Sequence, residues 1–163
     1  MNPYLLVFCI SIAVLCIAGI LICEFGSKWD NGRREGCLLC EKYSSKIFES
    51  KRFFVILDDF PVRKGHLLLI PRRHIEDLTD LSRAEFRDLH DVLQRMMKYL
   101  EVHFQADGYN LGVNCGEAAG QTERHLHIHV IPRRLGDVPN PRGGIRKFLP
   151  NPVKEYPQER DGL

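Results

Sequence analysis

Charged side chains are missing from the first 23 residues of this 163-residue chain. All 23 basic and 21 acidic residues lie in the remaining 140, where they occupy about 31% of the positions. The hydrophobic share of 44% therefore averages two different pieces. One is a fully apolar N-terminal segment, and the other is an ordinary soluble chain long enough to form one domain with its own core.

An excess of one sign of charge is also missing, because the formal net charge is only +2. Dedicated nucleic-acid-binding proteins usually have a much more basic footprint, so this balance argues against nucleic acid as a partner. An intrinsically disordered chain is excluded too, since the hydrophobic content is high and the charges are balanced. No internal repeat is visible in the sequence.

The uncharged residues 3–23 have the length and composition of a membrane-spanning helix. As a helix, these 21 residues would reach about 31 Å, which matches the hydrocarbon core of a bilayer. A cleaved signal peptide is the alternative, but no Lys or Arg precedes the run and no small-x-small cleavage site follows it. Lys28, Arg33 and Arg34 follow the run, so the positive-inside rule predicts a single-pass membrane protein with its C-terminal domain in the cytoplasm.

The chain divides by composition into four parts. Residues 3–23 are the predicted anchor, and the polar residues 24–36 are a short linker. Residues 37–156 form the predicted domain, and residues 157–163 are a tail. The last part of that domain is rich in Pro and Gly and is expected to lie over the surface.

Apolar or alternating runs bounded by turn-forming residues predict four strands. These strands are expected at residues 53–57, 66–70, 109–114 and 125–131. Apolar residues at three- and four-residue spacing from Phe86 to Phe104 predict one long amphipathic helix, which Ser82 and Glu85 begin with a capping box. Short connections between the strands favour an α+β domain with an antiparallel sheet.

Three histidines, His125, His127 and His129, alternate with apolar residues in the last predicted strand. Alternation places the imidazoles on one face while their apolar neighbours enter the core. A solvated polar face is the simple alternative, but imidazoles seldom cluster unless their ring nitrogens are bonded. Metal binding, acid–base catalysis and nucleophilic attack all use such a face. The glycine-bearing residues 115–123 just before it favour phosphoryl chemistry, because such loops bring backbone amides close to an anion.

Cys37 and Cys40 form a C-x-x-C pair. Alone, this spacing fits a zinc half-site, a redox pair or coincidence.

The run NCGEAAGQTERHLHIHVIPR closely resembles the signature of the histidine triad family. The resemblance extends upstream through KGHLLLIPRRHI and downstream through GDVPNPRGGIRKFLP. It implies an antiparallel meander sheet with one main amphipathic helix, and a homodimer. It also implies a hydrolase or transferase that acts on the α-phosphate of purine nucleotides such as dinucleoside polyphosphates or nucleoside phosphoramidates.

The same resemblance assigns roles to residues by their position in the motif. His127 matches the nucleophile, which forms a nucleotidyl-histidine intermediate. His129 matches a phosphate contact, and Asp58 falls where members hold the ribose hydroxyls. The other implied substrate-binding positions are His66, Asn114, Gln121 and Thr122.

Some members of this family combine an N-terminal C-x-x-C with two histidines. The resemblance therefore implies a structural zinc site at Cys37, Cys40, His74 and His125. An unmetallated thiol pair and a disulfide are the alternatives. No cofactor is implied for the chemistry itself.

Two questions of function stay open at this level. A membrane-tethered module that binds nucleotides with little turnover is the alternative to an enzyme, and a thiol redox protein using Cys37 and Cys40 ranks last. The stretch from Arg133 to Lys147 contains five basic residues and one acidic residue. It is either a solvated segment or a surface that meets the distal phosphates of a polyphosphate substrate.

Overall fold

A computed structural model describes residues 32–148 of the chain. The predicted anchor at residues 3–23, most of the linker, residues 149–156 of the predicted domain and the tail lie outside these described residues. Within residues 32–148, no helix combines the length and apolar character needed to cross a bilayer.

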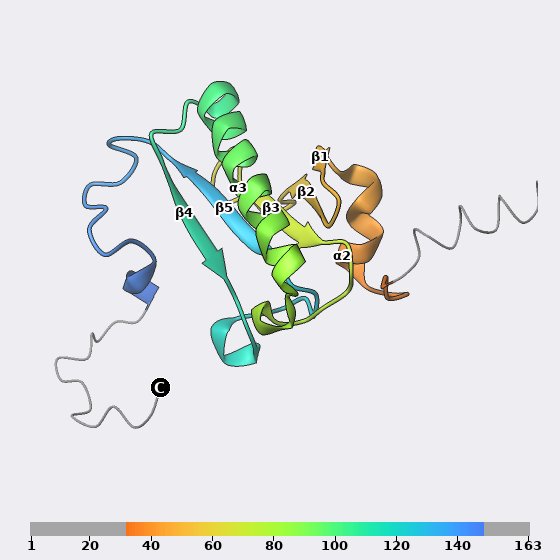
Figure 1. The fold of residues 1–163 in the computed structure, drawn as a ribbon. Coiled ribbons are helices and arrows are strands. Elements are labelled where there is room, and N and C mark those ends of the chain that lie inside the picture. The colour runs from red at the N-terminus through yellow and green to blue at the C-terminus, as the bar shows by residue number, and fades with distance from the viewer. Residues whose placement is uncertain (1–31, 149–163) are drawn as a thin grey trace, which may run out of the picture.

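Five antiparallel strands form one sheet, with one long helix and several short helical turns around it (Figure 1). The strands are β1 (Phe48–Glu49), β2 (Phe53–Leu57), β3 (Leu67–Pro71), β4 (Gly108–Val113) and β5 (Ile128–Arg133). The α-helices are α2 (Leu38–Glu41) and α3 (Arg83–Phe104). The 3-10 turns are η1 (Lys42–Ser45), η2 (Leu78–Asp80), η3 (Glu117–Ala119) and η4 (Gly144–Phe148). The predicted α+β class with an antiparallel sheet is confirmed.

The strand order β1-β2-β3-β5-β4 differs from the meander implied by the resemblance. Strands β1, β2 and β3 lie side by side in chain order, but β4 and β5 are exchanged. After β3 the chain passes through the long α3 and forms β4 at the far edge of the sheet. β5 then lies between β3 and β4. His129 therefore lies in the interior of the sheet, opposite Leu68 of β3 and Gly112 of β4.

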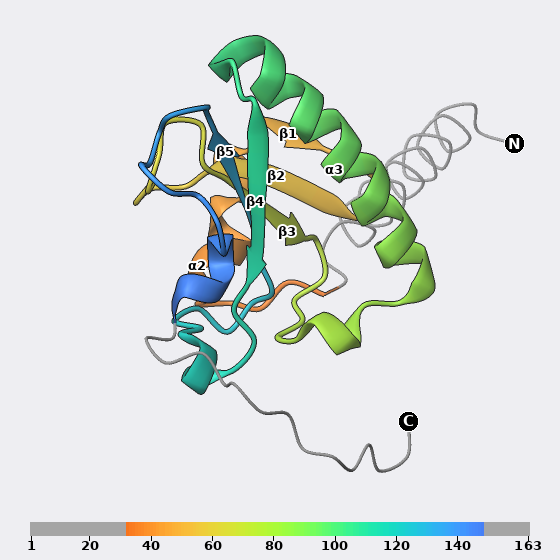
Figure 2. The ribbon, with the colours of Figure 1, turned by 90° about the vertical axis from the view of Figure 1, so that its left-hand side faces the viewer.

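Helices cover both faces of the sheet (Figures 1 and 2). One core lies under α3 and includes Phe53, Val55, Leu67, Leu69, Leu89, Val92, Met96 and Leu100. A smaller core lies under α2 and contains Leu39, Phe54, Ile56, Leu68 and Ile70. Alternate residues of β2 and β3 thus enter different cores, which explains why these strands appear in the sequence as continuous apolar runs.

Helix α3 begins and packs largely as its sequence predicts. The Ser82 side chain accepts a hydrogen bond from the Glu85 backbone and the Glu85 carboxylate binds the Ser82 backbone, which confirms the capping box. The helix ends at Gln105, whose φ of 52° is left-handed. Phe86, predicted as part of the buried stripe, is 60% exposed. The buried row runs instead through positions 85, 89, 92, 96 and 100, so Phe86 lies on its flank.

Strand β5 begins three residues later than predicted, at Ile128 instead of His125. The residues before it pair with a loop, because the Leu126 amide donates to the Ile75 carbonyl at 2.6 Å. The strand also continues through Pro132, where the sequence predicted its end. Pairing with β3 stops at Val130, so the missing N–H of Pro132 removes no hydrogen bond to β3.

Candidate active site

The three motif histidines lie on the face of the sheet opposite α3. Leu126, Ile128 and Val130 pack into the α3 core, as the alternation predicts. His125 and His127 are nevertheless almost completely buried, with 1% and 7% of their surface exposed. Both imidazoles must therefore be held by specific partners, because a buried ring nitrogen without a hydrogen bond is destabilising.

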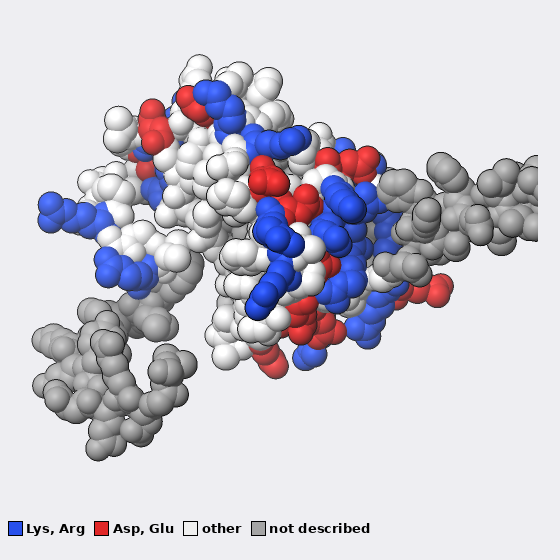
Figure 3. All heavy atoms as spheres, viewed as in Figure 1, with Lys and Arg blue, Asp and Glu red and all other residues white. Residues whose placement is uncertain are grey.

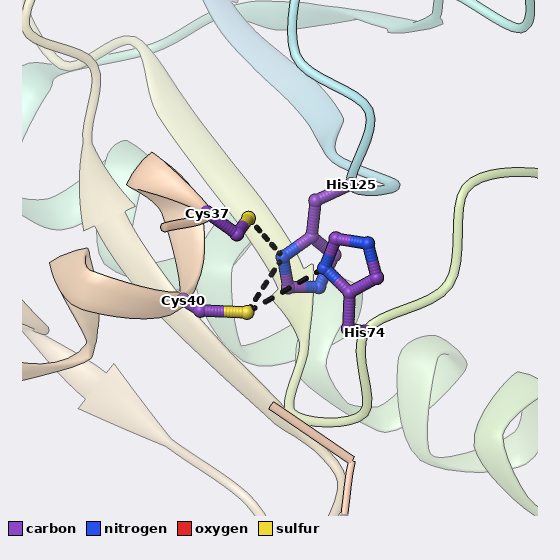
Figure 4. Close-up of side chains that lie close together, drawn as sticks. All are labelled: Cys37, Cys40, His74 and His125. Carbon is purple, nitrogen blue, oxygen red and sulfur yellow. Dashed lines mark hydrogen bonds between the residues drawn. The ribbon is translucent and has the colours of Figure 1, made fainter. Parts of the chain in front are cut away.

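Four side chains from three segments of the chain converge beside α2 (Figure 4). Cys37 precedes α2, Cys40 lies within it, His74 follows β3, and His125 precedes β5. The Nδ1 atom of His125 lies 3.5 Å from the Sγ atoms of both cysteines, and Nδ1 of His74 lies 3.6 Å from Sγ of Cys40. All four donor atoms lie within 4.8 Å of one another.

The spacing of these donors fits zinc. A tetrahedral zinc with sulfur at about 2.3 Å and nitrogen at about 2.0–2.1 Å separates those two atoms by about 3.6 Å. The Nε2 atom of His125 lies 3.0 Å from the Pro71 carbonyl, which can only accept a hydrogen bond. Nε2 therefore carries the hydrogen and leaves the Nδ1 lone pair facing the sulfurs, a usual arrangement for a metal ligand.

Protonation in this cluster also suits a metal site. Burial, with a smaller contribution from the nearby His74, lowers the pKa of His125 to about 4, so its imidazole is neutral near pH 7. Burial raises the pKa of the Cys40 thiol, which opposes the reactive thiolate that a redox pair requires. Cys37 and Cys40 are free in the structure, without a disulfide between them.

His127 is oriented by the backbone of a residue in the cluster. Its Nδ1 lies 2.8 Å from the His125 carbonyl oxygen. Because a carbonyl only accepts, Nδ1 carries the hydrogen and the lone pair lies on Nε2. The His127 ring stands edge-on to His129, with ring centroids 5.0 Å apart. An imidazole with its lone pair on Nε2 is suited to nucleophilic attack.

A chain of polar contacts leads from His129 to the end of β2. Nδ1 of His129 lies 3.0 Å from Nε2 of His66, which is itself buried. On the other side of His66, its Nδ1 lies 3.2 Å from Oδ2 of Asp58 and 3.4 Å from the Val62 amide nitrogen. Burial, followed by the neighbouring His127 and His66, lowers the pKa of His129 to about 4. The His129 ring is therefore neutral near pH 7.

Asp58 lies next to His66 instead of facing open solvent. Its Oδ1 accepts a hydrogen bond from the Phe60 amide at 2.9 Å, and only 13% of its side chain is exposed. Each carboxylate oxygen can accept a further bond. A ribose contact by Asp58 thus stays a prediction. In the structure Asp58 has the additional role of holding His66.

Gln121 has both ends of its amide engaged within the protein. Its Nε2 donates to the Glu76 carbonyl at 2.9 Å, and its Oε1 accepts from the Gly116 amide at 2.8 Å. Gln121 therefore ties the loop before the histidines to the segment after β3. The predicted substrate contact by Gln121 requires one of these bonds to open or to be shared.

Asn114 and Thr122 lie in the same loop between β4 and β5. The Asn114 Nδ2 donates to the Gly120 carbonyl at 3.5 Å, and Thr122 is exposed. Gly116 and Gly120 have φ values of 81° and 82°, a conformation that glycine adopts without strain. Four backbone amides of this loop, those of Gly116, Ala119, Gly120 and Gln121, already donate to acceptors within it, so a bound anion would have to use the others.

The structure gathers the predicted residues into three groups. Cys37, Cys40, His74 and His125 make the Cys/His cluster. The second group is His127, His129, His66 and Asp58, and the third is the loop with Asn114, Gln121 and Thr122. Sequence reasoning missed the carbonyls of Pro71 and Glu76 because any residue type supplies a carbonyl.

Comparison with known proteins places this site in a family. The sequence model of the HIT domain family matches residues 40–136. A bis(5'-adenosyl)-triphosphatase from Dictyostelium discoideum is 37% identical over 99 residues, which are 61% of this chain and 66% of that protein. A bis(5'-nucleosyl)-tetraphosphatase (asymmetrical) from Schizosaccharomyces pombe is 39% identical over 94 residues, 58% of this chain and 52% of that protein. Both names describe enzymes, which confirms the prediction of an enzyme family.

One solved structure of similar fold is a zinc-bound protein. A Zn-bound histidine triad family protein from Mycobacterium smegmatis has 39% sequence identity and a TM-score of 0.58, covering 63% of this chain and 78% of that one. The Cys and His cluster of the present chain is consistent with zinc on the same fold.

Proposed function

Because the chain belongs to the HIT domain family, we propose that it is a nucleotide hydrolase or nucleotidyl transferase. Its substrates are dinucleoside polyphosphates, nucleoside phosphoramidates or related purine compounds, and it acts on their α-phosphate. The relatives named as a triphosphatase and a tetraphosphatase support dinucleoside polyphosphates in particular. The observation that carries the proposal is the hydrogen bond from His127 Nδ1 to the His125 carbonyl, which leaves Nε2 free.

The reaction proceeds in two displacements at phosphorus. In the first, the Nε2 lone pair of His127 attacks the α-phosphorus, and the N–P bond forms as the bond to the leaving group breaks. The leaving group departs with the bonding electron pair and takes a proton from solvent. In the second, water attacks the same phosphorus, the N–P bond breaks, and the nucleoside monophosphate leaves while the water's proton goes to solvent. Splitting a difficult displacement in this way is the usual benefit of covalent catalysis.

Neutral His129 is proposed to contact the phosphate during these steps, together with those amides of the loop at residues 115–123 that have no acceptor in the described structure. His129 stays close to His127 because His66 holds its Nδ1. Backbone amides of a glycine-bearing loop stabilise an anion without a positive side chain.

The Cys37, Cys40, His74 and His125 cluster is proposed as a structural zinc site. Zinc bound there would join α2 to the segments that precede β5 and follow β3, and four protein ligands leave no open position for substrate. No reaction step depends on it.

Residues 3–23 are proposed to anchor the domain at the cytoplasmic face of a membrane. Their uncharged length and the basic residues that follow support this. Membrane fractionation of the full chain with and without residues 3–23 tests it, and loss of the segment should release the protein. A homodimer is proposed from the family resemblance. Light scattering of the purified protein gives its mass, and a monomer at all concentrations would rule the dimer out.

The deciding experiment offers the full chain a panel of adenosine α-phosphate compounds. The panel holds diadenosine triphosphate, diadenosine tetraphosphate and adenosine 5'-phosphoramidate, with release of AMP or ADP measured by chromatography. His127→Ala should lower turnover at least about a thousandfold while the protein stays folded. His90→Ala, on the exposed side of α3, is the matched control and should keep full activity. Nucleotide binding without product from any compound would favour the binding module instead.

A further inference from the structure

The chain that follows β5 folds back beside β4 and brings a basic turn next to the histidine face. Residues 138–148, here called the basic arm, end in η4, which lies alongside β4 (Figure 2). The Arg133 side chain donates to Oδ1 of Asn110 on β4 at 2.5 Å. Gly144 packs against the same residue, because a Cβ at that position would lie 3.6 Å from the Asn110 Nδ2 atom.

Asn110 links the arm to the position of His129. Residues two apart on a strand share a face and lie about 7 Å apart. Gly112, two residues after Asn110, pairs directly with His129, and paired residues point to the same face of a sheet. The Gly143–Gly144 turn of the arm therefore lies beside β4 on the same face of the sheet as His129. Its contact residue, Asn110, is about 7 Å along β4 from the residue that pairs with His129.

The arm presents positive charge that nothing in the described structure neutralises. Arg142 and Arg146 are exposed, and within residues 32–148 their guanidinium groups make no hydrogen bond or ion pair. Arg133, by comparison, is bound to Asp137 through two bonds of 2.7 Å. Lys147 donates to the Asn140 carbonyl at 2.6 Å, which holds the turn together. Figure 3 shows basic side chains at η4 with no described acidic side chain beside them on the visible face.

We propose that Arg142 and Arg146 bind the phosphates of the substrate beyond the α-phosphate. This inference rests on the proposed function and narrows its substrate class to compounds whose leaving group is itself a phosphate chain. Guanidinium groups match phosphate oxygens with two parallel hydrogen bonds, and a leaving group of two or three phosphates carries several negative charges. A phosphoramidate offers no such group, so the arm distinguishes the two candidate substrates.

The first test compares substrates with and without distal phosphates, using the full chain. The double variant Arg142→Gln and Arg146→Gln should raise KM for diadenosine triphosphate about tenfold, as expected for two partly exposed charge-assisted contacts. Its kinetics with adenosine 5'-phosphoramidate should stay within about twofold of wild type, because neither arginine touches that compound. Arg87→Gln is the matched control, since Arg87 is an exposed arginine of α3 on the other side of the sheet.

The second test does not need turnover. Inorganic tripolyphosphate should bind to the wild type, and calorimetry should show binding about tenfold weaker in the double variant but unchanged in Arg87→Gln. Equal KM values and equal tripolyphosphate affinity in wild type and double variant would overturn the role of the arm while leaving the proposed function intact. Loss of tripolyphosphate binding in the double variant of a protein that releases no product from any compound would instead support the arm and reject the proposed function.

Discussion

A single glycine, Gly65, fixes the backbone just before His66 and the start of β3. Its φ is 89°, and a Cβ placed there would lie 2.8 Å from ring atoms of Phe104. The position therefore needs both glycine's conformational freedom and its lack of a side chain. His66, whose Nε2 lies 3.0 Å from Nδ1 of His129, follows directly.

Replacing Gly65 by Ala should lower the free energy of unfolding by about 2 kcal/mol or more, because backbone strain and a clash with an aromatic ring combine. Urea denaturation measures the change. Gly108→Ala is the control, since a Cβ there has no neighbour within 4 Å and its φ is not left-handed. Equal effects of the two substitutions would contradict this account.

His66 is expected to act as a positioning residue for His129. His66→Ala removes the partner 3.0 Å from His129 Nδ1 and should lower kcat ten- to a hundredfold, a range of about the size seen when supporting partners of a site are lost. Nitrogen NMR of the His129 ring should show a changed tautomer population. An unchanged tautomer together with lost activity would mean that His66 contacts the substrate itself.

At the scale of the element, the N-terminus of α3 holds a buried carboxylate. Glu85 is 5% exposed, accepts from the Ser82 backbone at 2.9 Å, and receives two hydrogen bonds from the Arg73 guanidinium at 3.1 and 2.9 Å. The bonds from Arg73, followed by those from Ser82, lower the pKa of Glu85 to about 2. The residue thus fastens the helix to the segment after β3.

The low pKa of Glu85 makes stability depend on pH. The unfolded chain takes up this proton near pH 4.5, whereas the folded protein resists it until about pH 2. Stabilisation of about 3 kcal/mol is therefore complete above pH 5 and is lost as the pH falls toward 2. Glu85→Gln should remove most of this stabilisation at pH 7. The unfolding free energy, measured by urea denaturation at a series of pH values, should then fall less steeply toward low pH.

Glu101→Gln serves as the control for that measurement. Glu101 lies on the exposed side of α3 and its one ion pair within residues 32–148 is with Lys98, so its loss should change stability by less than about 0.5 kcal/mol. If the free energy of unfolding of Glu85→Gln still falls steeply at low pH, the pH dependence belongs to other carboxylates.

Local pattern predicted the elements better than their arrangement. Residues 53–57 form β2 as expected, and Ser82 begins α3 because a capping box depends only on neighbouring residues. α2 and β1 were missed, since four and two residues are too short to show a period. The insertion of β5 between β3 and β4 depends on contacts far apart in the sequence, which no local pattern records.

At the scale of the whole molecule, the Cys/His cluster joins segments that are distant along the chain. Cys37 and Cys40 bring α2 to His74 and His125, which lie 34 and 85 residues after Cys40. The residues of this cluster were predictable from the family resemblance. Its link to His127 was not, because it runs through a backbone carbonyl.

Removal of the cluster should reduce metal content and stability together. Cys40→Ser is expected to lose bound zinc and to lower Tm by roughly 10 °C, because metal binding free energy contributes directly to folding. Elemental analysis and thermal unfolding before and after chelation measure both effects. Cys115→Ser, a free cysteine outside the cluster, should change neither. Equal metal content in all three proteins would show that the cluster binds no zinc.

The carbonyl of residue 125 has a consequence for how such proteins can diversify. Its oxygen orients His127, and every amino acid type brings the same oxygen to that position. The imidazole of His125, in contrast, lies 3.5 Å from the sulfur of Cys37 and 3.0 Å from the Pro71 carbonyl. A substitution at residue 125 therefore removes one donor of the Cys/His cluster but leaves the carbonyl that orients His127. The cluster and the orientation of His127 can thus change separately in evolution.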